Sequence, residues 1–344
     1  YIMIAMAGGA IAGLLAQWGL IRTFSMTPRD LLRWGVLLAA GGNLVVAFAP
    51  DYAAVVVGFA ISSLGYGFAR PGFTAGASLA VNLGAALAGA GREVMLLDAD
   101  TGLANVDVML GLSPTRHIGH LLDGECSLES LVMPAACGLQ VVPAGSGARR
   151  LAQLDSNQLA AIIRAFDELA RPPEFLLVDT AAGLSDSVTM FAAAVDDVVL
   201  VVCDEPASLT DAYGLAKVLS RDFGVRRLRM VANMVRNEGD ARLLHQKLAR
   251  VSDRFLDLVI EFCGWVPHDE RLRQAIRRQA AVVELWPSSP SARAFKKLAE
   301  SVDKWVEPGR AGLDRISFFG GRAVPAGETR DERDFGISTI LPRE

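Results

Sequence analysis

The sequence predicts a doubly wound α/β domain with a mainly parallel sheet, preceded by about three transmembrane helices. From about residue 79, short apolar runs alternate with segments of helical periodicity, which is typical of a parallel sheet covered on both faces. Before that point the chain carries long uncharged runs. We therefore divide the 344 residues into a transmembrane fragment (1–78), an α/β domain (79–308) and a mostly disordered, polar tail (309–344).

Three uncharged runs in the first part of the chain predict helices that span a membrane. They cover residues 1–21, 34–50 and 52–69, close to the roughly 17–25 residues that cross a bilayer. They are rich in Gly and Ala, as packed transmembrane helices often are, although buried helices of a soluble core are the alternative. Arginines in the first connection, and Arg70 after the third run, place both on the cytoplasmic side. We expect membrane attachment through residues 1–70.

The elements of the α/β domain follow from periodicity and from helix and strand end signals. Strands are predicted at 93–98, 139–143, 175–179, 197–203, 228–233 and in a short run before Pro267. Helices are predicted at 79–91, 157–170, 208–223, 239–252, 269–279 and 290–304. In such a sheet the ligand site lies at the carboxyl ends of the strands.

Three carboxylates follow two of these predicted strands. Asp98 and Asp100 end one strand, and Asp179 ends another about 80 residues later. Carboxylates at this position suit Mg²⁺ bound through water beside phosphates, because Mg²⁺ takes few protein ligands. A single strand-end Asp can instead be a helix N-cap. Two such elements, each followed by Gly, indicate a nucleotide site.

Two longer segments strengthen this interpretation. Asp98–Asp107 (DADTGLANVD) is similar to the switch I motif of MinD/ParA ATPases, and Val178–Asp186 (VDTAAGLSD) resembles their Walker B and switch II. Further segments resemble the flagellar-number regulator branch called FlhG or FleN: 202–213, 232–235, 253–257 and 264–267. The resemblance covers about 79–320 and includes a P-loop NTPase fold.

The resemblance implies a set of roles. Asp100 would position the attacking water as a catalytic residue, and Asp179 would be catalytic by holding the magnesium shell. Asp98, Asn233 and Pro267 would contribute to cofactor binding, Asn233 through adenine and Pro267 beside the base. The implied cofactors are ATP and Mg. The implied partners are a second copy of the chain and a flagellar regulator or assembly protein, and the implied activity is ATP hydrolysis.

One part of that family pattern is missing. No G-x-x-x-x-G-K-[ST] motif occurs in the chain, and residues 66–78, where a strand and phosphate loop would precede the first helix, contain no lysine. We therefore expect impaired ATP binding and hydrolysis. The missing strand would be central, so its loss would expose pairing edges, unless residues 53–65 substitute for it.

The N-terminal part resembles something else. Residues 17–35 and 70–78 are similar to part of a major facilitator superfamily transporter, a fold of about twelve helices. The alternatives are therefore a truncated transporter, or a membrane-tethered, nucleotide-independent binding module. A genuine fusion predicts the inner membrane with a cytosolic C-terminal domain, and an artefactual one a cytoplasmic protein. Residues 79–344 hold 30 Lys and Arg against 36 Asp and Glu, which predicts no direct nucleic-acid partner.

Overall fold

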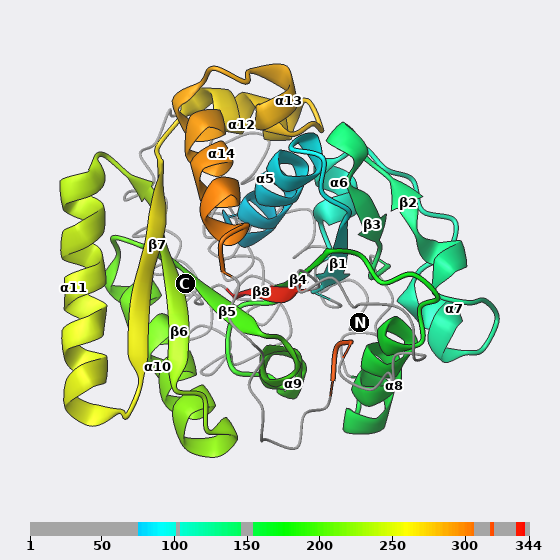
Figure 1. Ribbon diagram of the computed structural model, residues 1–344, viewed down its shortest axis with the longest axis horizontal. Coiled ribbons are helices and arrows are strands. Elements are labelled where there is room, and N and C mark those ends of the chain that lie inside the picture. Colours follow the sequence, from blue (N-terminus) through cyan, green and yellow to red (C-terminus); the bar gives the residue numbers. More distant parts are fainter. Residues whose placement is uncertain (1–74, 101–103, 146–153, 306–316, 320–334, 341–344) are drawn as a thin grey trace, which may run out of the picture. The chain divides into compact units, whose positions relative to one another are not determined.

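The computed structural model describes residues 75–100, 104–145, 154–305, 317–319 and 335–340, the last by backbone alone (Figure 1). Within these ranges, none of the helices combines the length and the hydropathy needed to cross a bilayer. The three predicted membrane segments, the substitute strand 53–65 and the transporter resemblance up to residue 74 lie outside the described residues and stay predictions.

One eight-stranded sheet forms the centre of the domain, in the order β2-β3-β1-β4-β8-β5-β6-β7. Every neighbouring pair runs parallel except β2 with β3. The strands are β1 (Val94–Ala99), β2 (Met133–Pro134), β3 (Gln140–Val142), β4 (Phe175–Thr180), β5 (Asp197–Cys203), β6 (Arg227–Val235), β7 (Val259–Pro267) and β8 (Phe335–Ile340).

Helices pack on both faces of this sheet. One face is covered by α7 (Ile118–Leu122), α8 (Ser156–Asp167), α9 (Asp186–Ala194), α10 (Pro206–Phe223) and α11 (Glu238–Phe255). The other is covered by α5 (Ala75–Gly89), α6 (Val106–Met109), α12 (Glu270–Arg277), α13 (Val282–Leu285) and α14 (Pro290–Val302). Two short 3-10 helices, η3 (Glu129–Leu131) and η4 (Ala136–Gly138), flank β2.

Alternation along the strands explains why both faces are apolar. Leu97 of β1 packs in the core under α8 and α9, whereas its neighbour Leu96 packs in the core under α5 and α14. Both side chains are fully buried. Successive side chains of a strand point to opposite faces, so a continuous apolar run feeds two cores at once. The doubly wound architecture predicted from the sequence is confirmed for these residues.

The tail contains an element that the sequence did not predict. Residues 335–340, within the segment expected to be mostly disordered, form β8. This strand, red in Figure 1, lies between β4 and β5 and pairs in parallel with both. The sheet therefore has no open edges at its centre, in contrast to the exposed edges that we expected from a missing strand.

Candidate functional site

The candidate site is built on two adjacent strands. Asp98 of β1 and Asp179 of β4 are direct partners in the parallel ladder, each at the last position but one of its strand. Both carboxylates are almost completely buried, with 1% and 3% of their surface exposed. The structure thus brings together two of the acids that the sequence selected, at the carboxyl ends of their strands.

Backbone N–H groups hold Asp98 in place. Its carboxylate accepts hydrogen bonds from the N–H groups of Asp100, Asn105 and Val106, each at 3.2 Å. Burial raises the pKa of Asp98 from 3.8 to about 7; the Val106 N–H opposes that rise, and the negative charge of Asp100 adds to it. The contacts of Asn105 and Val106 were not predicted, because backbone N–H groups seven and eight residues after Asp98 carry no sequence signal.

Asp179 is less well satisfied than its neighbour. Its Oδ1 atom is buried and has no hydrogen-bond partner among the described residues. Burial holds the pKa of Asp179 well above its usual range, and the nearby charges of Asp98 and Asp100 raise it further. A buried carboxylate oxygen facing other carboxylates is a position that a cation would stabilise.

Asp100 directly follows the end of β1. It is half-buried, and its charge acts on both Asp98 and Asp179. The following residues, 101–103, are outside the described part of the chain. All three acids predicted from the sequence therefore converge on one point at the carboxyl ends of β1 and β4.

The first described helix, α5, points its N-terminus toward the same end of the sheet. A tight turn joins α5 to β1, and the two elements pack together, so they run in opposite directions. Ser78, in the first turn of α5, has a buried hydroxyl without a partner among the described residues. Asn82 fixes the helix by donating to the Ser78 carbonyl (2.8 Å) and accepting from the N–H of Val282 in α13 (2.7 Å). A helix N-terminus favours negative charge, such as phosphate.

The donor atoms fit magnesium bound mainly through water. In the described ranges, no three His, Cys, Asp or Glu side chains are grouped to hold a metal by themselves. Magnesium does not need such a group, because it keeps several waters and uses one or two carboxylates together with phosphate oxygens. The unpartnered oxygen of Asp179 is the atom best suited to this role.

The two residues predicted at the base are on other strands. Asn233 lies on β6 and Pro267 at the end of β7, separated from β4 by β8 and β5. The Asn233 side-chain oxygen accepts from the N–H of Met234 (3.0 Å), which has a left-handed φ of 54°. Pro267 pairs with Val235 in the ladder. The structure therefore places both near the ends of neighbouring strands, but away from the carboxylate pair.

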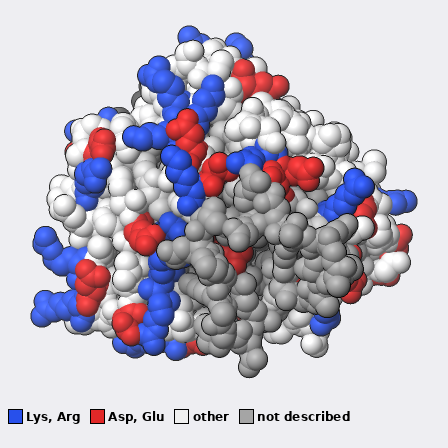
Figure 2. Space-filling view, in the orientation of Figure 1, with Lys and Arg blue, Asp and Glu red and all other residues white. Residues whose placement is uncertain are grey.

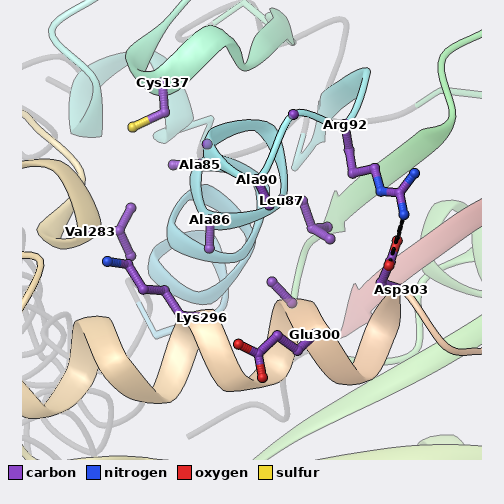
Figure 3. Close-up of a pocket in the computed structure, with 13 residues that line it drawn as sticks. Ala85, Ala86, Leu87, Ala90, Arg92, Cys137, Val283, Lys296, Glu300 and Asp303 are labelled. Carbon is purple, nitrogen blue, oxygen red and sulfur yellow. Dashed lines mark hydrogen bonds and ion pairs between the residues drawn. The ribbon is translucent and has the colours of Figure 1, made fainter.

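A pocket of about 520 Å³ lies elsewhere in the domain (Figure 3). It is lined by the last turns of α5, by Cys137 and by Lys296 and Glu300 of α14. At one end, the Arg92 side chain reaches Asp303 at 2.8 Å. Because this pocket adjoins the C-terminus of α5, it is at the opposite end of that helix from Ser78 and belongs to a different surface.

Charges on the visible surface are mixed in sign. Figure 2 shows Lys and Arg side chains interspersed with Asp and Glu over the face that includes α11. There, Arg242 pairs with Glu238 (2.6 Å) and Lys247 of α11 pairs with Asp204 (3.1 Å). Neighbouring charges of opposite sign cancel at longer range, so this face does not attract one class of charged partner.

Comparison with known proteins identifies the relatives of this fold. The family model described as "CobQ/CobB/MinD/ParA nucleotide binding domain" matches residues 77–282. The chain is 45% identical over 247 residues to the antiactivator FleN of Pseudomonas aeruginosa, covering 72% of this chain and 88% of that protein. It is 27% identical over 235 residues to the flagellum site-determining protein YlxH of Helicobacter pylori, covering 67% and 79%.

Solved structures give the same fold. The cell division ATPase MinD of Pyrococcus furiosus superposes with a TM-score of 0.55 at 24% identity, covering 67% of this chain and 94% of that one. The MinD protein of Pyrococcus horikoshii, solved with Mg-ADP, gives 0.54 at 24% identity, covering 68% and 92%. The likeness shows a MinD-like P-loop NTPase fold with a mainly parallel sheet, as the sequence predicted.

Proposed function

This chain belongs to the CobQ/CobB/MinD/ParA nucleotide-binding family, and from that premise we propose that it is a flagellar-number regulator with impaired ATP binding and hydrolysis. One observation carries the proposal. The buried carboxylate pair of Asp98 and Asp179 is in place, yet the sequence contains no phosphate-loop motif to bind the phosphates beside it.

The proposed roles follow from the positions of the side chains. If nucleotide were bound, Asp179, with its unpartnered oxygen, would hold the water shell of magnesium, and half-buried Asp100 would orient the attacking water. Asn233 and Pro267 would contact the base from β6 and β7. Magnesium, when bound, neutralises charge on the phosphates. Asp98 stabilises the loop after β1 through its three N–H contacts.

Impairment follows from electrostatics. Phosphoryl transfer depends mainly on positioning and on stabilising charge, and the loop backbone and its lysine provide most of both. Removing a single stabilising donor costs about 10²–10³ in rate. The five lysines of this chain, Lys217, Lys247, Lys296, Lys297 and Lys304, lie on α10, α11, α14 and just beyond α14. None of these lysines is close in sequence to the start of α5, where an intact relative would have its phosphate loop.

The relatives indicate the kind of partner. FleN is named an antiactivator and YlxH a flagellum site-determining protein. We propose that this chain likewise binds a flagellar regulator and forms a homodimer. Both interactions are independent of ATP, because the chain does not switch between nucleotide-bound and nucleotide-free states. Residues 1–70 tether it to the inner membrane, which leaves the α/β domain in the cytosol.

The test is ATP turnover and binding by the full chain, purified in detergent micelles. We expect no Mg²⁺-dependent phosphate release above that of Asp179→Asn, and no saturable binding of a fluorescent ATP analogue. Asp222→Asn, on the exposed surface of α10, is the matched control for losing one carboxylate. Turnover that depends on Asp179 but not on Asp222 would overturn the proposed impairment.

A further inference from the structure

Among the described strands, β8 alone joins the two halves of the sheet by backbone pairing. β4 pairs with β1 on one side and with β8 on the other, while β5 pairs with β6 and β8. No ladder joins β4 to β5 directly in the described residues. Without β8 the sheet would be two separate sheets, β2-β3-β1-β4 and β5-β6-β7, with an unpaired strand edge on each.

The space between β4 and β5 is as wide as one strand, and the strand that fills it runs parallel to both neighbours. Five residues of β8, from Phe335 to Thr339, pair with β4, and four, from Ile337 to Ile340, pair with β5. Neighbouring strands lie about 4.8 Å apart, so a strand paired on both sides fills a gap of roughly 10 Å between β4 and β5. An extended hexapeptide running parallel to both neighbours satisfies the two edges at once.

The segment is well suited to this position by its sequence. Ile337, Thr339 and Ile340 are β-branched, which favours extended backbone. The run Arg330–Asp334 (RDERD) is fully charged and Pro342 follows two residues after the strand. Charged residues and proline favour strand ends over strand interiors. Residues 335–340 therefore differ in composition from the residues on either side, which favours a strand with these ends.

A second contact brings the tail to the correct side of the domain. Phe318 and Phe319 are buried, 3% and 6% exposed, under α8 and α9. The Phe318 ring packs edge-on against Phe166 (5.8 Å) and stacks on Phe191 (6.3 Å). The Phe319 N–H also donates to the Asp167 carboxylate. Fifteen residues, 320–334, connect this anchor to β8, and a chain of that length can span at most about 50 Å.

We infer that the gap between β4 and β5 is a strand-acceptor site, and that residues 335–340 are its ligand, a separable donor strand supplied by the tail of the same chain. Strands β4 to β7 each begin within eight residues of the end of a helix, whereas thirty-two residues (303–334) separate the end of α14 from the start of β8. The site accepts an extended, β-branched hexapeptide in parallel orientation, and this binding does not require nucleotide.

The decisive experiment removes the ligand and returns it in trans. A full chain truncated after Asp334 is compared with one truncated after Ile340, which keeps β8 and is the matched control. We expect amides of β4 and β5 to exchange about 100-fold faster in the first, and at the original rate in the second. Adding a synthetic peptide of residues 331–344 in excess restores protection, and a peptide of the same composition in scrambled order does not.

A second measurement avoids a chain that fails to fold. In the intact chain, amides of residues 336–340 exchange as slowly as those of β4. Ser338→Pro, which removes a central ladder N–H, abolishes that protection, whereas Ser338→Ala keeps it. Two results would overturn the inference. One is that amides of residues 336–340 exchange at the rate of the free peptide. The other is that truncation after Asp334 leaves the protection of β4 and β5 amides unchanged. Protection that appears only in a dimer would overturn the assignment to the same chain.

Discussion

The sheet contains two buried groups of charged side chains, and they are organised in opposite ways. Near the amino ends of their strands, Arg229 of β6 pairs with Asp197 of β5 (2.8 Å) and Glu261 of β7 (2.9 Å), under the ring of Trp305. Near the carboxyl ends of β1 and β4, Asp98 and Asp179 are neighbours and form no ion pair with a Lys or Arg side chain of the described residues. The first group is balanced within the chain, whereas the second is not.

The difference separates structure from function. Burial alone would lower the pKa of Arg229, but the hydrogen bond and charge of Asp197 raise it overall. In the other group, burial and like charges raise the pKa of Asp179 together. A paired buried charge is compensated within the fold, while an unpaired buried carboxylate destabilises the fold unless a ligand binds it. The unbalanced group is therefore the candidate site, and four measurements test this comparison.

The largest effect is expected at the balanced group. Arg229→Met removes the closer partner of buried Asp197 and leaves it only the longer ion pair with Arg227 (3.7 Å). This change should lower the free energy of unfolding by about 4 kcal/mol in urea denaturation of the α/β domain. The control is Arg273→Met, which removes an exposed pair with Glu270 (3.3 Å) and should cost about 0.5 kcal/mol. Equal losses at the two positions would contradict the distinction between buried and exposed pairs.

The next effect is a pH dependence at the unbalanced group. The folded pKa of Asp98, about 7, is raised above the ordinary 3.8, so its contribution to stability is full below pH 4 and is lost as pH rises through 7. We expect a loss of about 3 kcal/mol between pH 4 and pH 7 in the unfolding free energy. Asp98→Asn should make the profile shallower without abolishing its slope, because the raised pKa of Asp179 contributes in the same direction. Exposed Asp222→Asn should leave the slope unchanged.

A smaller effect separates Asp179 from an ordinary acid. Because its folded pKa is also raised, Asp179→Asn should stabilise the domain more at pH 8 than at pH 4. Thermal unfolding at the two pH values gives the difference directly. Destabilisation by Asp179→Asn at pH 8 would show that the ionised Asp179 carboxylate has favourable partners in the folded chain. That result would contradict the assignment of Asp179 to an unbalanced charge group.

The smallest effect is that of magnesium without nucleotide. For a dissociation constant of about 5 mM, 10 mM Mg²⁺ should stabilise the folded domain by about 0.6 kcal/mol. The shift in unfolding midpoint should disappear in Asp179→Asn and persist in Asp222→Asn. A shift of the same size in both variants would place the cation elsewhere, and would remove the support for this carboxylate as its ligand.

Much of the site followed from local sequence. Asp98, Asp100 and Asp179 were selected because each ends an apolar strand run, and the structure brings all three together. β5 forms at the predicted residues, 197–203. Short elements were harder: α9 was not predicted, because its nine residues give too little periodicity to distinguish a helix from a loop.

The sequence by itself determined the α/β class, the order of the long elements, the strand-end acids and the lack of a phosphate-loop motif, because these depend on patterns within one segment. Only the tertiary structure decided which segment occupies the centre of the sheet and which buried charges are paired. Residues 335–340 pair with β4 and β5, and Arg229 pairs with Asp197, although these partners are far apart in the sequence. Such pairings depend on which strand edges and buried charges still lack a partner once the rest of the fold has formed. A pattern within one segment of the sequence does not contain this information.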